Sequence, residues 1–202
     1  MYTVGITGGI GSGKTTIARI WQEMGAFVLF ADDLAKDIMI SDQDVIRDIK
    51  AKFGEQAYLE DGSLHKKYLK EQVFKKGRVE ELNGIVHPKV FAHTTQKIKE
   101  TEQKGYDVFV KEAALLLKYG RPKEFNKIVL VLSDEDKRIA RVTERDDASS
   151  DEIKARIDKQ QNFEKHRADA DFVIYNNGTQ EDLELRAKIL YHKFREQAQH
   201  AV

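Results

Sequence analysis

The sequence predicts an α/β fold in which a five-stranded parallel sheet is covered by helices. Five short runs of β-branched, aliphatic and aromatic residues are predicted as strands, at residues 2–6, 27–30, 107–111, 127–132 and 171–175. Helical patterns lie between or after them, as at residues 15–24 and 182–197. Because the apolar residues in these strands are continuous rather than alternating, we expect both faces of the sheet to be buried.

Length and composition restrict the classes of protein. The chain has 202 residues, 41% of them hydrophobic, which is enough for one sizeable domain with an inserted lobe. Positive and negative charges balance at 34 each, so the sequence lacks the basic bias of nucleic-acid-binding proteins. It has no cysteine, no basic apolar leader and no run near the roughly 20 apolar residues that span a membrane. We therefore expect a cytoplasmic protein with no nucleic-acid or membrane partner.

The spacing of the predicted strands is uneven. No convincing strand occurs between residues 30 and 107, where the pattern is helical with turns. This stretch is predicted as a mostly helical insertion between the second and third strands. A second segment without strands, residues 133–170, is rich in charge and also helical in pattern.

A glycine-rich stretch after the first strand carries the clearest chemical signal. GGIGSGKT, residues 8–15, matches G-x-x-x-x-G-K-[ST] and lies between a predicted strand and a predicted helix, as a phosphate-binding loop requires. Glycines let backbone amides approach phosphate oxygens, and the following helix adds the positive end of its dipole. We expect Lys14 to reach the β- and γ-phosphates of ATP and the Thr15 hydroxyl to bind Mg²⁺. The predicted nucleotide-binding residues are Gly11, Ser12, Gly13, Lys14, Thr15 and Thr16. The alternative is a glycine-rich turn with an exposed lysine.

Other motifs narrow the class of nucleotide-dependent protein. GTPases need N-K-x-D to read guanine, and the stretch at residues 126–129 lacks the aspartate. Motor and AAA-type ATPases usually have an apolar strand that ends in Asp-Glu. The nearest candidate here, VFVKEA, ends in a lysine followed by the single acid Glu112. A small-molecule kinase is the class that remains.

Two carboxylates follow the second predicted strand. Asp32 and Asp33 lie at its carboxyl end, the edge at which ligands bind in open α/β sheets. One of them, with Asp32 preferred, is predicted to orient the acceptor hydroxyl or to take its proton. The alternative is that both acids only cap the next helix.

The charged segment offers arginines for a lid. Arg138, Arg141 and Arg145 share one face of a predicted helix. Guanidinium groups stabilise the charge of a transferring phosphoryl group, and a mobile lid can deliver them. We expect that role for Arg141 and Arg145. For Arg138 we expect the alternative, a solvent-exposed position on a charged helix of the kind that forms Glu–Arg pairs such as Glu152 with Arg156.

The histidines show no spacing typical of a metal site. His87 precedes Pro88, and the pair is predicted to shape a turn into the next helix. A substrate contact by His87 is the alternative.

Taken together, these stretches resemble the dephospho-CoA kinase family over nearly the whole chain. The similar motifs are VGITGGIGSGKTT (4–16), ADDLAK (31–36), DGSLHKKYLKEQVF (61–74), VHP (86–88), RVTERD (141–146), ARIDKQ (155–160) and ADFVIYNNG (170–178). The phosphate loop alone is shared by many enzymes, but this ordered set is specific.

The resemblance implies a fold, a reaction and roles for residues. It implies a three-layer P-loop kinase core of the nucleoside-monophosphate-kinase type at residues 1–33, 97–135 and 166–202, a helical acceptor-binding lobe at 34–96 and a helical lid at 136–165. The implied reaction transfers the γ-phosphate of ATP to the ribose 3′-hydroxyl of dephospho-CoA, giving CoA and ADP. The implied catalytic residues are Asp32, Lys14, Arg141 and Arg145, and the implied substrate-binding residues are Asp32, Lys66, Lys70 and His87.

The sequence departs from the family pattern at several positions. Phe30 replaces the first aspartate of D-A-D, and His65-Lys66 replaces Asp-Arg. Lys36 replaces an arginine, and Lys118 replaces the acid of P-L-L-F-E. Lysine keeps the charge of arginine but not its bidentate fork, so we expect these changes to affect substrate affinity more than reaction class.

Two other functions remain open from the residues. One is a P-loop kinase for another small alcohol or nucleotide, and the other is a nucleotide-binding regulator without catalysis. The acceptor-lobe motif at residues 61–74 argues against the first. Asp32 and the two lid arginines argue against the second, because a binding protein has no need of them.

Overall fold

The computed structural model describes residues 1–146 and 148–200. The chain forms two compact units, one made of residues 1–29 together with residue 98 onward, the other of residues 30–97. The predicted insertion, 34–96, falls inside the second unit, and the predicted lid, 136–165, inside the first. The predicted core segment 166–202 ends with two residues that lie outside the described part.

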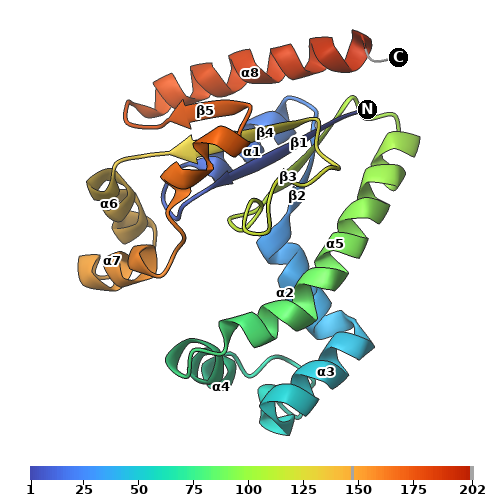
Figure 1. The fold of residues 1–202 in the computed structure, drawn as a ribbon, viewed down its shortest axis with the longest axis vertical. Helices are drawn as coiled ribbons and strands as arrows, with labels where there is room; N and C mark the ends of the chain where they lie inside the picture. The colour runs from blue at the N-terminus through green and yellow to red at the C-terminus, as the bar shows by residue number, and fades with distance from the viewer. Residues whose placement is uncertain (147, 201–202) are drawn as a thin grey trace. The chain divides into compact units, whose positions relative to one another are not determined.

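The first unit is built on a five-stranded parallel sheet in the order β2-β3-β1-β4-β5 (Figure 1). The strands are β1 Tyr2–Gly8, β2 Phe27–Phe30, β3 Val108–Glu112, β4 Lys127–Leu132 and β5 Phe172–Tyr175. In the register, Tyr2 is opposite Val108 on one side of β1 and Val4 is opposite Lys127 on the other. All five predicted strands are present, and the predicted fold class is confirmed.

Helices make up most of the remaining chain. The α-helices are α1 Lys14–Glu23, α2 Ala31–Ser41, α3 Gln43–Phe53, α4 Lys66–Lys70, α5 Val79–Gln103, α6 Glu135–Asp146, α7 Ser150–Asp158 and α8 Gln180–His200. Shorter helical segments are Glu55–Ala57 and Phe163–Asp169, both 3₁₀ helices, and the π-helical turn Glu71–Lys75. Within the described residues, no helix combines the length and the apolar character needed to cross a membrane.

An aromatic cluster joins one face of the sheet to α1 and α8, and Figure 1 shows α8 running along the sheet. Phe194 of α8 is fully buried, with its ring centroid 5.6 Å from that of Trp21 and 5.7 Å from that of Phe172. The Trp21 indole Nε1 donates a hydrogen bond of 2.8 Å to the Ala187 carbonyl. These contacts fix α1, and with it the end of the glycine loop, against the sheet.

The opposite face of the sheet is covered by the 3₁₀ helix Phe163–Asp169 and by the chain between β3 and β4. Phe163 packs on the buried Leu130 and Leu132 of β4. On the same face the Thr3 hydroxyl donates to the Glu124 carbonyl at 2.8 Å. Helices therefore lie on both sides of the sheet, which explains why the strands are apolar throughout.

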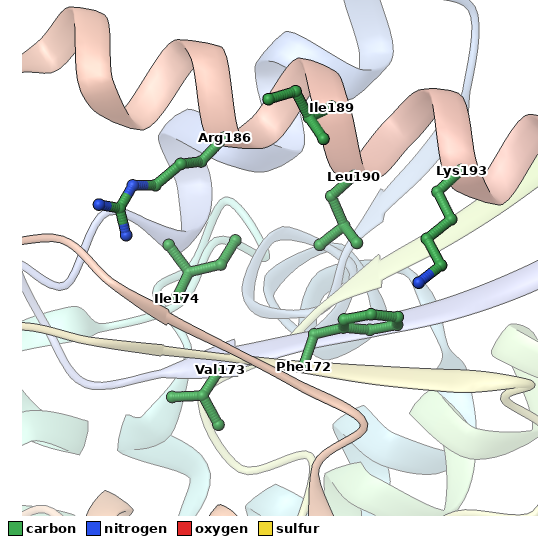
Figure 2. Close-up of a pocket in the computed structure, with 7 residues that line it drawn as sticks. All are labelled: Phe172, Val173, Ile174, Arg186, Ile189, Leu190 and Lys193. Atoms are coloured by element: carbon green, nitrogen blue, oxygen red, sulfur yellow. The ribbon is translucent and has the colours of Figure 1, made fainter.

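A shallow groove of about 340 Å³ lies between β5 and α8 (Figure 2). Its walls are the apolar side chains of Phe172, Ile174 and Leu190, with Arg186 and Lys193 at the rim. The Lys193 ammonium lies 5.0 Å from the centre of the Phe172 ring, a cation–π distance. None of the residues lining this groove belongs to the glycine loop.

The second unit has a hydrophobic core of its own. Its buried members are Ile38, Val45, Ile49, Phe53, Ala57, Tyr58, Leu69, Val73, Val86 and Val90. Asp42 caps α3 by accepting the backbone N–H groups of Asp44 and Val45, and it also pairs with Lys89 of α5 at 3.0 Å. The capping hydrogen bonds and the Lys89 ammonium hold the pKa of Asp42 below its usual value.

The predicted turn at His87-Pro88 is wrong. Both residues lie inside α5, which continues through Pro88. Proline removes one helical hydrogen bond and crowds the carbonyl four residues earlier, which belongs here to Gly84. Gly84 is exposed, so water can reach that carbonyl.

Phe194→Ala is expected to lower the free energy of unfolding by about 3–5 kcal/mol, because it removes a fully buried ring at the centre of the aromatic cluster. Urea denaturation followed by circular dichroism measures the loss. Leu185→Ala, on the exposed side of the same helix, is the control and should change stability by about 0.5 kcal/mol or less. Similar losses in both variants would contradict this account of the core.

Candidate active site

The glycine loop joins the central strand to a helix. β1 ends at Gly8 and α1 begins at Lys14, and Gly13 between them is the N-cap with φ +100°. Gly13 has no side chain to accept the first N–H groups of α1, so these donors remain available to a ligand at the positive end of the helix dipole. An anion-binding site is the direct consequence.

Asn176 encloses the loop next to Gly13. A Cβ atom at Gly13 would come within 2.4 Å of the Asn176 Nδ2 atom. That nitrogen donates a hydrogen bond of 2.9 Å to the Ser12 carbonyl, and Asn176 is buried at the end of β5. Only glycine satisfies both the backbone angle and the contact at this position.

Arg141 of α6 lies against the same part of the loop. Its guanidinium donates to the Asn176 carbonyl at 3.0 Å, to the Ser133 hydroxyl at 3.1 Å and to the Gly11 carbonyl at 3.4 Å. The structure thus brings Arg141 to the glycine loop, where the sequence predicts it to act.

Arg138 was expected to be a solvated helix residue, and this expectation is wrong. Its side chain is half-buried, and its Nε atom donates a hydrogen bond of 2.8 Å to the Ile10 carbonyl of the loop. Its Nη2 atom donates to Gln160 Oε1 at 3.2 Å. Burial lowers the pKa of the Arg138 guanidinium, which nevertheless stays charged.

Lys14 and Glu112 form an ion pair at the carboxyl end of the sheet. The Lys14 ammonium lies 3.3 Å from Glu112 Oε1, and the two side chains are only 13% and 6% exposed. Glu112 is the last residue of β3, the strand beside β1. The pair therefore holds the Lys14 side chain at the carboxyl edge of the sheet, beside the start of α1.

The ligands available at the start of α1 fit Mg²⁺ better than a metal ion that is coordinated entirely by protein side chains. Thr15 offers one hydroxyl in the first turn of α1 and is partly exposed. Across the described residues there is no group of three or more His, Cys, Asp and Glu side chains that could hold a metal ion. Mg²⁺ is usually bound by few protein ligands together with phosphate oxygens and water, which matches this set.

A pocket of about 300 Å³ adjoins the end of the loop. It is lined by Gly13, Thr16, Arg141, Asn176, Gly178, Thr179, Gln180 and Leu183. It therefore extends from the start of α1 to the start of α8, with both polar and apolar walls.

Arg145 is not engaged with the glycine loop. It pairs with the neighbouring Asp146 through two hydrogen bonds, of 2.7 and 3.1 Å, and its side chain is 61% exposed. Arg156 also lies 3.4 Å from Asp146. The hydrogen bonds from Arg145 hold the pKa of Asp146 below its usual value. The predicted role of Arg145 at the phosphate stays a prediction.

Asp32 and Asp33 occupy the first turn of α2 in the second unit. The N-cap residue is Phe30, which provides no side-chain hydrogen bond, so neither acid acts as the cap itself. Asp33 pairs with Lys36 at 2.7 Å, whereas the exposed Asp32 carries the predicted catalytic role.

The predicted substrate-binding residues of the second unit lie on two helices. Lys66 and Lys70 begin and end α4, and both are exposed. His87 lies in α5, with its ring 6.3 Å from that of Phe91. Their predicted roles stay predictions.

Three side chains that hydrogen-bond to the backbone of the loop had no role predicted from the sequence. They are Arg138, Gln160 and Asn176. The last two lie in motifs that resemble the family, ARIDKQ and ADFVIYNNG, which was the one signal pointing to them.

Gly13→Ala is expected to abolish measurable ATP binding, because the alanine Cβ meets Asn176 and a positive φ disfavours any side chain. Isothermal titration with ATP measures the effect, and circular dichroism checks that the chain is folded. Gly84→Ala is the matched control: its Cβ meets nothing within 4 Å, so ATP binding should be unchanged. ATP binding by Gly13→Ala at the parent affinity would refute the geometry described here.

Comparison with known proteins identifies the family. The dephospho-CoA kinase family model matches residues 2–182. The chain is 45% identical to a dephospho-CoA kinase of Salinibacter ruber, over 95% of this chain and 96% of that protein, and 34% identical to one of Geobacter sulfurreducens, over 96% and 98%. A solved structure from Thermus thermophilus is 30% identical with a TM-score of 0.76, covering 95% of this chain and 97% of that one. The chain therefore belongs to the dephospho-CoA kinase family.

Proposed function

We propose that the chain binds ATP with Mg²⁺ at the glycine loop and transfers the γ-phosphoryl group to the ribose 3′-hydroxyl of dephospho-CoA. The products are CoA and ADP, and the reaction is the final step of coenzyme A biosynthesis. One observation carries the proposal: a glycine loop with open helix amides and a lysine at the sheet edge, in a chain of this family. We place the reaction in the cytoplasm, consistent with a chain without cysteine.

The triphosphate is assigned to the loop residues from Gly11 to Thr16. The Ser12 N–H already donates to the Gly9 carbonyl at 3.1 Å, so the other backbone amides of this stretch are the open donors. When ATP binds, the Lys14 ammonium would turn partly away from Glu112 toward the β- and γ-phosphates, because these carry more negative charge than the single carboxylate. The pocket beside Gly13, Arg141 and Leu183 is the space available for the nucleoside, because it continues directly from the loop.

Mg²⁺ would be held by the Thr15 hydroxyl together with phosphate oxygens. Bound there, the ion supplies charge neutralisation for the phosphates. The chain itself orients the Thr15 hydroxyl, because the first turn of α1 fixes the position of this residue.

Asp32 would orient the acceptor 3′-hydroxyl and take its proton. The new bond joins this oxygen to the γ-phosphorus while the bond to the β–γ bridging oxygen breaks, so ADP leaves with the electron pair. Arg141 and Arg145 would stabilise the charge on the equatorial oxygens, as guanidinium groups do in phosphoryl transfer.

Lys66, Lys70 and His87 are proposed to bind the acceptor. The lysines are one helical turn apart on α4, so they lie on one face and can attract an anionic group of the acceptor. This assignment corresponds to a core at residues 1–33, 97–135 and 166–202, an acceptor lobe at 34–96 and a lid at 136–165.

A panel of acceptors assayed with ATP tests the function. Dephospho-CoA should give ADP release with a kcat/KM far above that of nucleoside monophosphates, shikimate or other small alcohols. Preference for one of those alcohols or nucleotides would establish a different kinase. ATP binding without turnover on any acceptor would favour a regulator.

Asp32→Asn is expected to bind ATP normally and to lower kcat by about 10²-fold or more, because amide nitrogen and oxygen cannot take the proton. Titration calorimetry and steady-state assays separate the two effects. Asp33→Asn is the matched control, since the Asp33 carboxylate is paired with Lys36, and its kcat should stay close to that of the parent. Near-normal kcat in Asp32→Asn would remove Asp32 from catalysis.

A further inference from the structure

Ile10 anchors the glycine loop in the segment formed by α6 and α7. Its side chain packs on a small hydrophobic cluster whose buried members are Val142, Ile153 and Ile157. A residue of the phosphate-binding loop thus belongs to the core of a neighbouring helix pair. The position of the Ile10 backbone consequently depends on the position of α6 and α7.

Both backbone polar groups of Ile10 are bonded by side chains. The Ile10 N–H donates to Gln160 Oε1 at 2.9 Å, and the Ile10 carbonyl accepts from Arg138 Nε at 2.8 Å. Arg138 Nη2 closes the ring by donating to the same Gln160 oxygen at 3.2 Å. Since Ile10 lies in neither a helix nor a strand, these two side chains take the place of secondary-structure hydrogen bonds.

The direction of the Ile10 carbonyl decides the direction of the next amide. In a planar trans peptide the C=O and the following N–H point in opposite directions. With the Ile10 carbonyl turned outward to Arg138, the Gly11 N–H is turned to the opposite side. Rotation of this peptide would instead present a carbonyl oxygen, which repels phosphate.

Arg138 fits closely on the outside of the loop. A Cβ atom at Gly9 would come within 2.5 Å of Arg138 Nη2, so the guanidinium lies directly against this glycine. The arginine is held in place by α6 and by Gln160, and has little freedom to release the carbonyl.

We infer that Arg138 is a positioning residue for the phosphate-binding loop, acting through the Ile10 carbonyl with Gln160 as its partner. This inference rests on the proposed function only in that the loop holds the phosphates of ATP. Arg138 touches neither the phosphates nor the acceptor in this role. Its effect should therefore fall on nucleotide affinity and leave acceptor affinity unchanged.

The test measures the Kd of ATP alone, without acceptor, by titration calorimetry. Arg138→Met should raise this Kd about tenfold, because a charged hydrogen bond to the carbonyl is lost. Arg138→Lys should recover part of the affinity, since an ammonium can still donate to Ile10. In steady-state assays the KM for ATP should rise while the KM for dephospho-CoA stays constant.

A double-mutant cycle tests the partnership with Gln160. Gln160 bonds the Gly9–Ile10 peptide and Arg138 bonds the Ile10–Gly11 peptide, and the two side chains are also bonded to each other. If they act together on Ile10, Arg138→Met combined with Gln160→Met should raise the Kd by less than the product of the single effects. Arg186→Met, which removes an exposed arginine at the groove shown in Figure 2, is the matched control and should bind ATP like the parent.

Several results would overturn the inference. They are an unchanged Kd in a folded Arg138→Met, a lysine variant no better than the methionine variant, or effects of Arg138 and Gln160 that simply multiply. Should Arg138→Met not fold, the lysine variant and Gln160→Met still decide the outcome. Failure of dephospho-CoA as acceptor would refute the proposed function alone, because the ATP titration does not involve the acceptor.

Discussion

The site depends on hydrogen bonds from side chains that keep carbonyl groups of the glycine loop pointing away from the phosphate-binding side. Between β1 and α1 the loop has no ladder or helix to fix its peptides, so side chains from elsewhere do so. Arg138 holds the Ile10 carbonyl, and Asn176 holds the Ser12 carbonyl. Since each trans peptide then turns its N–H the other way, donors for phosphate are organised before any ligand arrives.

The parallel sheet determines where these side chains come from. β1 lies between β3 and β4, with β5 beyond, so the carboxyl ends of all these strands meet around the loop. Glu112 ends β3, Ser133 follows β4 and Asn176 follows β5. The sheet order thus delivers an acid to Lys14 and two polar side chains to Arg141 and the loop.

What could be predicted from the sequence was local, and what could not was a matter of long-range contact. Strands and the glycine loop follow from residue types and spacing within short windows, and they were predicted. Arg138 is 128 residues from Ile10, and nothing in its own helical pattern reveals that contact. The His87-Pro88 pair predicts a turn, yet α5 continues through it.

The contacts of α6 also limit how its segment can move. Its early residues Arg138 and Arg141 are bonded to the loop, and Ile10 is packed into the α6–α7 cluster. A rigid swing of the segment would break these contacts together. Arg145, in contrast, is exposed and bonded only weakly to Asp146, because water screens such surface pairs. Turning the Arg145 side chain toward a phosphate therefore disturbs far less of the structure than lifting the whole segment.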